Sequence, residues 1–277
     1  MHTTIVHQSQ LSPSEQAVIL EMIPGELIHK GTCYRLIHEH EVSAESLFAL
    51  REQLQMDINT LPEGFDPGRV KLVISDMDST FINIECIDEI ADFAGVKPQV
   101  SAVTEAAMRG ELNFEESLNQ RVGLLKGLHT DALQKVYDER LSLNPGAEVL
   151  LHGLKEREIP FALVSGGFTF FTDRLKQRYQ LDYTRSNSLE RDGEQLTGKV
   201  LGQIVGAGVK REFLLELCEE LKIQPSQVVA MGDGANDLLM MEVAGLSVAY
   251  CAKPTVKEKT SCVLDHTGLN SVLDLIS

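Results

Sequence analysis

The chain has 277 residues and a formal net charge of −16 at pH 7, with 25 Lys and Arg against 41 Asp and Glu. This balance argues against nucleic-acid binding, which needs clustered basic residues. No run approaches the ~18 consecutive apolar residues that span a bilayer, and no secretory pattern follows Met1. The five cysteines lack CxxC spacing and indicate reduced thiols, so we expect a cytoplasmic protein without a membrane partner.

Residues 1–66 are expected to form a small α/β module at the N-terminus. Strands are predicted near residues 3–6 and 34–37, and helices from Ser12-Pro13 onward and over residues 43–54. A Pro- and Gly-containing linker over residues 62–68 ends the module. It lacks a glycine-rich ligand loop, so homodimer formation is the plainest role for it, and ligand binding remains open.

A carboxylate pair follows the first strand after this linker. The apolar run Val70-Lys71-Leu72-Val73-Ile74 predicts a buried strand that leads into Asp76-Met77-Asp78-Ser79-Thr80. Two carboxylates just past such a strand lie where open α/β sheets place their ligands. Asp-x-Asp alone usually marks a solvated turn, so this pair needs support from elsewhere in the chain.

Three later stretches supply that support. Leu163-Val164-Ser165-Gly166-Gly167 is a strand that ends in a hydroxyl and two glycines, a pattern suited to close contact with an anion. Lys210 lies near the start of a predicted helix, and Val228-Val229-Ala230-Met231-Gly232-Asp233 runs into a second acidic loop. Each stretch alone is compatible with a plain turn or a solvated charge. Together, in this order, they indicate a site for phosphoryl transfer.

The intervening segments predict helices and further strands. Residues from about 86 to 144 read as helical, with apolar side chains at helical spacing. From residue 144 onward strands and helices alternate, as in a parallel sheet with crossover helices, and Asp192-Gly193 and Thr197-Gly198 suggest a hairpin. The predicted fold class is therefore α/β, with a parallel sheet at its centre.

These motifs resemble the haloacid dehalogenase-like hydrolase superfamily, and within it the phosphoserine phosphatases. The resemblance runs from about residue 71 to the C-terminus. Its motifs are Asp76-Met77-Asp78-Ser79-Thr80, Glu85-Cys86-Ile87-Asp88-Glu89, Asn113-Phe114 to Arg121-Val122, Val164-Ser165-Gly166-Gly167-Phe168, Gly232-Asp233-Gly234-Ala235-Asn236-Asp237 and Cys251-Ala252-Lys253-Pro254. It implies a Rossmann-like sheet core over residues 67–277, with a helical cap inserted at about 86–144. Related phosphatases often carry an ACT-like regulatory domain where residues 1–66 stand.

The resemblance also implies Mg²⁺-dependent hydrolysis of O-phospho-L-serine, the last step of serine biosynthesis. Asp76 would be the nucleophile that forms an aspartyl phosphate, and Asp78 the general acid and base. Mg²⁺ would be held by Asp76, Asp233 and the backbone carbonyl of Asp78, with Asn236 or Asp237 behind them.

Substrate recognition is implied at both ends of the ester. Ser165, the Gly166 N–H and Lys210 would hold the phosphate, with Lys210 offsetting charge on both Asp76 and the phosphate. Asn236 is a further candidate. Glu85 would bind the substrate ammonium, and Arg121 its carboxylate. An ordinary solvated pair of helix charges is the alternative for Glu85 and Arg121.

Other functions remain open at this point. The same core could act on a different phosphomonoester or transfer the phosphoryl group to an alcohol. A regulatory protein with a degenerate hydrolase core is disfavoured, because every expected catalytic position is filled.

Overall fold

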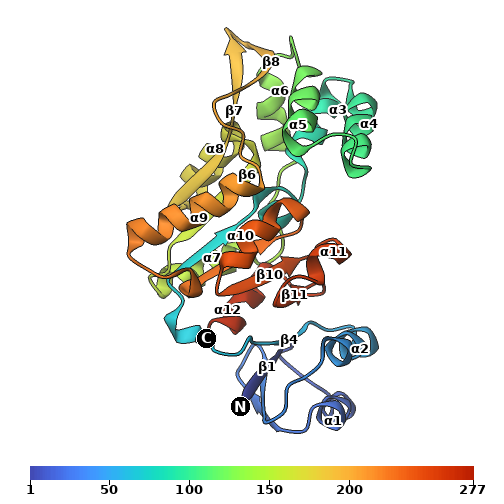
Figure 1. Cartoon of the computed structure of the whole chain (residues 1–277), viewed down its shortest axis with the longest axis vertical. Helices are drawn as coiled ribbons and strands as arrows, with labels where there is room; N and C mark the ends of the chain where they lie inside the picture. Colours follow the sequence, from blue (N-terminus) through green and yellow to red (C-terminus); the bar gives the residue numbers. More distant parts are fainter.

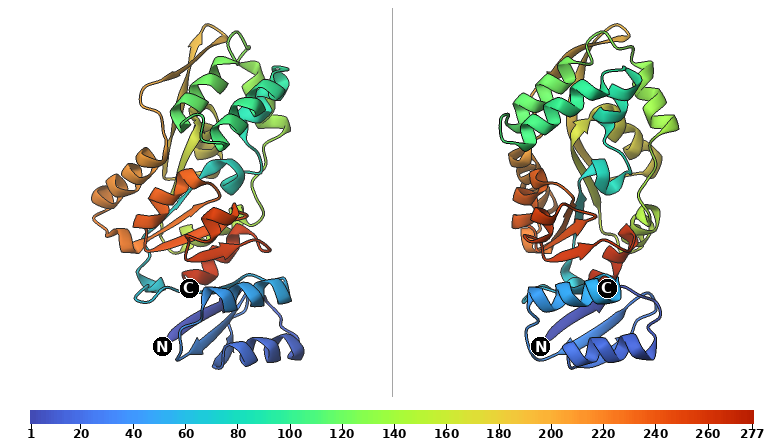
Figure 2. Two further views of the ribbon diagram at one scale, coloured as in Figure 1. Left: turned by 45° about the vertical axis from the view of Figure 1, so that its right-hand side comes forward. Right: turned by 90° about the vertical axis from the view of Figure 1, so that its right-hand side faces the viewer.

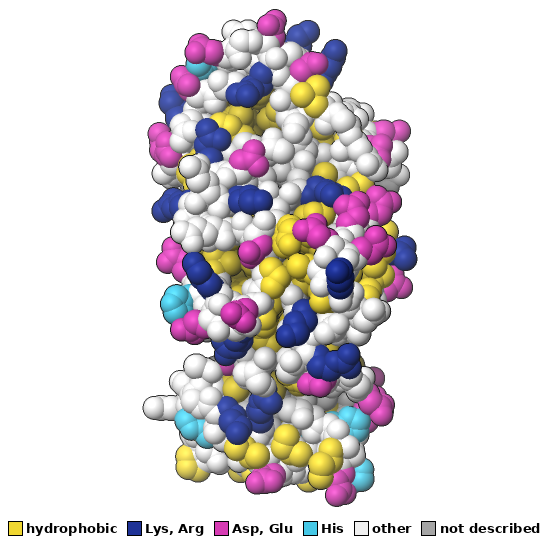
Figure 3. Space-filling model, turned by 90° about the vertical axis from the view of Figure 1, so that its left-hand side faces the viewer, with side chains coloured by type: hydrophobic (Ala, Val, Ile, Leu, Met, Phe, Trp, Pro, Cys, Tyr) yellow, Lys and Arg dark blue, Asp and Glu magenta, His cyan; other side chains and the backbone are white. Residues whose placement is uncertain are grey.

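The computed structural model describes residues 1–277, apart from the side chain of Met108. The molecule is elongated, with a small sheet at one end, a large sheet in the middle and a group of helices at the other end (Figures 1 and 2). No helix in the described part of the chain is long and apolar enough to cross a lipid bilayer. On the face drawn in Figure 3, basic and acidic side chains are interspersed.

The small sheet is antiparallel, with strand order β2-β3-β1-β4. Helix α1 begins with a capping box in which Ser12 and Glu15 exchange hydrogen bonds, and Pro13 occupies its first turn. The predicted strands and helices of this region are confirmed, but β2 and β4 were missed because they are only four and three residues long. The elements are β1 His2–Val6, α1 Pro13–Met22, β2 Glu26–His29, β3 Tyr34–His38, α2 Ala44–Leu54 and β4 Ile58–Thr60.

The large sheet has seven strands in the order β11-β10-β9-β5-β6-β7-β8. Its pairs are parallel except for the β7–β8 hairpin, which confirms the α/β fold class. The strands are β5 Leu72–Ser75, β6 Phe161–Phe168, β7 Tyr183–Asp192, β8 Gln195–Leu201, β9 Val228–Gly232, β10 Leu246–Tyr250 and β11 Cys262–Leu264.

Helices cover both faces of this sheet, and alternate strand residues point to each side. Leu72 and Ile74 of β5 pack with α9 and α10, whereas Val73 belongs to the core that α7, α8 and α12 cover. The helices are α7 Ala147–Glu156, α8 Thr169–Tyr179, α9 Ala207–Leu221, α10 Leu238–Val243, α11 Pro254–Lys257 and α12 Val272–Leu275. Single 3₁₀ turns are η1 Pro67–Arg69, η3 Pro225–Gln227, η4 Ala235–Asp237 and η5 Leu269–Ser271.

A helical insert between β5 and β6 lies beside the tip of the β7–β8 hairpin (Figure 1). The hairpin turns at Gly193, whose φ of 58° is readily adopted by glycine, and it contacts the insert through the pairing of His129 with Gln195. The insert is therefore supported from the sheet side. Its helices are α3 Cys86–Phe93, α4 Lys97–Met108, α5 Phe114–Gly123 and α6 Asp131–Glu139.

The small sheet contacts the large one through buried polar side chains of β4 and the residue before it. Both carboxylate oxygens of Asp57 accept backbone N–H bonds from Asp265, His266 and Thr267, at 2.8–3.3 Å. The amide of Asn59 pairs with the backbone of Val263 as a neighbouring strand would, accepting at 2.7 Å and donating at 2.9 Å. These bonds satisfy the free edge of β11.

Candidate active site

The candidate residues meet at the carboxyl ends of three adjacent strands. Asp76 follows β5, the Ser165–Gly167 segment lies near the end of β6, and Asp233 follows β9. Since β5 lies between β6 and β9 and runs parallel to both, these groups share one edge of the sheet. Open α/β sheets bind ligands at this edge.

Lys210 is completely buried beneath the site. Its Nζ donates to Asp76 Oδ1 at 2.6 Å and to Asp237 Oδ1 at 2.7 Å. Burial by itself lowers the pKa of Lys210, but the charges of Asp237 and Asp76 outweigh it and raise the pKa above its usual value. The lysine is therefore a fixed positive charge that holds the Asp76 carboxylate in place.

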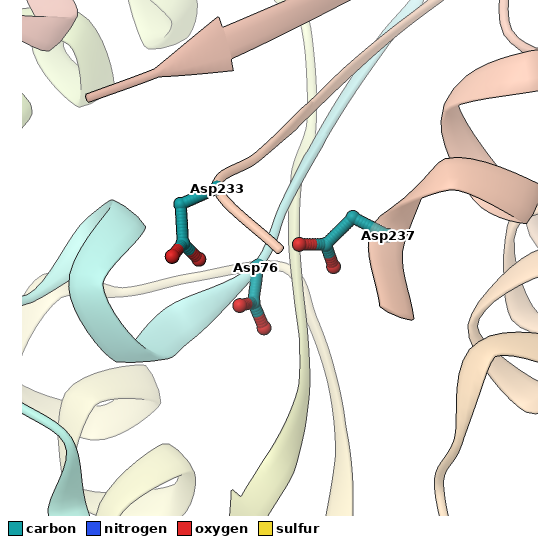
Figure 4. Close-up of side chains that lie close together, drawn as sticks. All are labelled: Asp76, Asp233 and Asp237. Atoms are coloured by element: carbon teal, nitrogen blue, oxygen red, sulfur yellow. The ribbon is translucent and has the colours of Figure 1, made fainter. Parts of the chain in front are cut away.

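Three carboxylates converge above this lysine. One oxygen from each of Asp76, Asp233 and Asp237 lies within 4.8 Å of the other two (Figure 4). Burial, and then the charges of Asp237 and Glu85, raise the pKa of Asp233 to about 6. Burial and the Asp237 charge also raise the pKa of Asp76. One ammonium does not neutralise three carboxylates, and this all-oxygen donor set fits a hard divalent cation.

The side chain of Asp78 lies outside this cluster. Its Oδ1 accepts the backbone N–H of Cys86, the first residue of α3, at 3.2 Å. Burial, and then the charge of Glu85, raise the pKa of Asp78 to about 7. Asp76 precedes the irregular turn Met77–Phe81, whereas Asp78 lies within it in an extended conformation, and Ser79 adopts a φ of 58°. Asp76 and Asp78 therefore occupy different environments, as two different tasks require.

The glycines after Ser165 allow unusually close contacts. A Cβ at Gly166 would lie 2.9 Å from Cζ of Phe114, at the start of α5. A Cβ at Gly167 would lie 2.7 Å from Asp78 Oδ2. The backbone N–H of Gly167 donates to Ser165 Oγ at 2.7 Å. Helix α8 begins two residues later, so its free N–H groups face the same edge.

The helical insert adds a second set of charged groups. Glu85 precedes α3 and accepts the Ser79 hydroxyl at 2.7 Å, and Arg121 in the last turn of α5 donates from Nε to Ser117 O at 3.3 Å. Both side chains line a cavity of about 720 Å³, and Asp76 and Asp233 of the acidic cluster line it as well. Glu85 is exposed, and Arg121 is half-buried.

The structure thus brings the predicted residues together around one cavity. Those that line it are Asp76, Asp78, Glu85, Arg121, Ser165, Gly166, Asp233 and Asn236, while Lys210 lies below its floor. Asp237, which was expected behind the metal ligands, has one oxygen in the cluster. Its Oδ1 accepts from Lys210 at 2.7 Å and its Oδ2 from the Gly234 N–H at 3.0 Å.

Sequence reasoning gave no role to Ser79, Asp88 or Lys253, although all three line the cavity. Their position inside the quoted motifs was the signal that could have found them.

Comparisons with known proteins agree with this geometry. A model of haloacid dehalogenase-like hydrolases matches residues 70–245. A phosphoserine phosphatase from Polaromonas sp. is 54% identical over 211 residues, covering 74% of this chain and 89% of that protein. Two solved structures are also similar. A haloacid dehalogenase family hydrolase from Salmonella enterica has a TM-score of 0.91 and 35% identity, covering 100% of this chain and 99% of that one.

A phospho-aspartyl intermediate analogue of a phosphoserine phosphatase has a TM-score of 0.70 and 41% identity, covering 75% of this chain and 99% of that one. The match to the family model spans the acidic loops and the insert described above. The chain belongs to the phosphoserine phosphatases of the haloacid dehalogenase-like hydrolase family.

Proposed function

We propose that this chain hydrolyses O-phospho-L-serine to L-serine and inorganic phosphate. One observation carries the proposal: a single cavity is lined by acids, by the Ser165–Gly167 segment of β6 and by Glu85 and Arg121. Phosphoserine carries the complementary groups, a phosphate together with an ammonium and a carboxylate. The phosphoserine phosphatases among the relatives support the same substrate.

Asp76 is the proposed nucleophile. One of its oxygens attacks phosphorus, and the bond between phosphorus and the serine oxygen breaks, leaving an aspartyl phosphate. Lys210 holds Asp76 Oδ1 at 2.6 Å, which fixes the direction of the carboxylate. The solved phospho-aspartyl analogue of a relative supports this intermediate.

Asp78 is the proposed general acid and base. Its protonated form gives its proton to the departing serine oxygen, and the resulting carboxylate then takes a proton from the water that attacks the aspartyl phosphate. That attack breaks the bond between phosphorus and the Asp76 oxygen and releases phosphate. A pKa of about 7 suits both roles, because each form is available near neutral pH.

A divalent cation, proposed as Mg²⁺, would be held by Asp76, Asp233 and the backbone carbonyl of Asp78. When bound, it would neutralise charge on the phosphate oxygens. Ser165 and the Gly166 N–H are proposed to hold the non-bridging oxygens, with Lys210 balancing charge beneath them and Asn236 at the rim.

The insert is proposed to recognise the serine portion. Glu85, held by the Ser79 hydroxyl, would pair with the ammonium, and Arg121 would bind the carboxylate through its planar fork. We propose the division of the chain into residues 1–66 and 67–277, with the cap at about 86–144. The five free cysteines fit the proposed cytoplasmic setting.

The test measures phosphate release from phospho-L-serine, phosphothreonine and an aryl phosphate, with and without Mg²⁺. We expect metal-dependent turnover that favours phospho-L-serine, and loss of at least ~10³-fold in kcat for Asp76→Asn. Asp173→Asn, which removes an exposed carboxylate from α8, is the matched control. Full activity of Asp76→Asn would contradict the mechanism, and a preference for the aryl phosphate would contradict the substrate.

A further inference from the structure

One carboxylate oxygen in the cavity has no partner. Asp88 lies in the first turn of α3 and lines the cavity, yet its Oδ1 is buried and accepts no hydrogen bond from any described residue. An acid in the first turn is favourable to a helix, but Asp88 makes no capping hydrogen bond there. A buried acceptor left without a donor is costly, which indicates that a donor turns toward it when a ligand binds.

Arg121 lines the same cavity, and of the basic side chains its charge acts most strongly on Asp88. Among the described residues its guanidinium donates only from Nε, to Ser117 O at 3.3 Å. Its remaining N–H groups are free to turn. Arg has five donors in a planar fork, so one edge can meet a protein carboxylate while another meets a ligand.

The electrostatics of the two side chains point the same way. Burial raises the pKa of Asp88, and the charge of Arg121 is the largest effect in the opposite direction. Burial lowers the pKa of Arg121, and the charge of Asp88 opposes this more strongly than those of Glu85 and Asp78. Of these acids, Asp88 therefore interacts most strongly with the guanidinium.

The two recognition groups of the cap differ in how they are held. Glu85 already accepts a 2.7 Å hydrogen bond from Ser79, so its orientation is fixed before a ligand binds. Arg121 has a single weak bond to a carbonyl of its own helix. A long side chain without further support loses rotamer freedom when it binds a ligand, and an orienting partner reduces that cost.

We propose that Asp88 is a positioning residue for Arg121, locking the guanidinium plane when a substrate carboxylate binds. The proposal rests on the carboxylate-binding role of Arg121 in the proposed function. Asp88 then sets the preference for phosphomonoesters that carry a carboxylate over those that do not, without touching the ester itself.

The test compares phosphoserine with O-phosphoethanolamine, which keeps the phosphate and the ammonium but lacks the carboxylate. In Asp88→Asn we expect KM for phosphoserine to rise about 10-fold, with kcat within about twofold. KM for phosphoethanolamine should change by less than about twofold. Glu115→Gln is the control, because it removes one negative charge from an exposed position in the first turn of α5, outside the cavity lining.

A second comparison separates positioning from packing. In an Arg121→Ala background, Asp88→Asn should add no further rise in KM for phosphoserine, since the residue to be positioned is gone. Asp88→Ser is measured alongside, so that the result does not depend on one replacement folding.

The proposal would be overturned if KM rose equally for both substrates or rose for neither. It would also be overturned if Asp88→Asn raised KM for phosphoserine further in the Arg121→Ala background. Failure of the proposed function gives a different result, because the unsubstituted enzyme would then not favour phosphoserine.

Discussion

Replacement of the buried lysine is the sharpest test of how the site is held together. Lys210→Met keeps an unbranched apolar side chain of nearly the same length. It removes the ammonium that donates to Asp76 and Asp237. All three side chains are buried, with Lys210 and Asp237 fully inaccessible. The variant therefore leaves two carboxylates close together in the interior without a counter-charge.

The expected cost follows from that burial. Removing one partner of a buried ion pair typically destabilises a protein by ~3–5 kcal/mol, because the remaining charge is uncompensated. For a chain of this size the midpoint of thermal unfolding should fall by about 10 °C. Added Mg²⁺ should recover part of the loss in the variant, because a cation bound only by the folded state stabilises it.

The loss should also depend on pH. Burial and the Asp237 charge raise the pKa of Asp76, and Lys210 is the charge that opposes them, so the variant raises this pKa further. The unfolded value is about 3.9. Above it the folded variant binds more protons than the unfolded chain, so its stability falls as pH rises. The difference from the unsubstituted protein should be small near pH 4 and grow toward neutral pH.

The assay is urea unfolding from about pH 4 to 8 in the presence of a chelator, followed by repetition with Mg²⁺. Arg211→Met removes one positive charge from an exposed position next to Lys210 on α9 and should shift stability by less than ~0.5 kcal/mol. A Lys210→Met variant with unchanged stability at pH 7, or with a loss that is the same at every pH, would refute the reasoning.

Three further perturbations address the cap, the small sheet and the acidic cluster. Gly166→Ala places a methyl group against Phe114 and should lower kcat/KM by ~10-fold or more. The Gly166→Ala/Phe114→Ala double variant should recover part of that activity, and no recovery would exclude this clash as the cause. Asp57→Ala removes acceptors of several buried bonds and should cost ~3 kcal/mol at the contact between the sheets, seen as faster proteolysis in the linker after β4. Glu63→Ala, at an exposed linker position, should leave that rate unchanged, and equal rates for both variants would contradict the role of Asp57. Asp233→Asn should abolish the Mg²⁺-dependent rise in melting temperature, and a retained rise would place the cation elsewhere.

The chain order of the motifs already indicated much of the site. Strands that end in Asp76, Ser165 and Asp233 can be recognised locally, because a short apolar run that ends in polar residues is typical of a buried strand. Parallel strands end at one edge of their sheet, so proximity of these groups followed from the α/β pattern alone. The resemblance also implied that Lys210 offsets charge on both Asp76 and the phosphate.

Other features depend on contacts between residues far apart in the chain. The bond from Lys210 to Asp76 joins residues 134 positions apart, and only the strand order β9-β5-β6 brings them together. The approach of Asp237 to Asp76 also joins residues far apart in the chain. Strand patterns report burial but carry little information about which strands are neighbours.

The sequence by itself determined the fold class, the acidic and glycine-rich loops and the chemistry they suit, since these follow from short-range patterns of residue type. Only the tertiary structure decided how the cap meets the sheet, where Phe114 touches Gly166, and that Asp88 is left without a partner beside Arg121. Whether a buried polar group is satisfied depends on every neighbour in space, and no local pattern of residues contains that information.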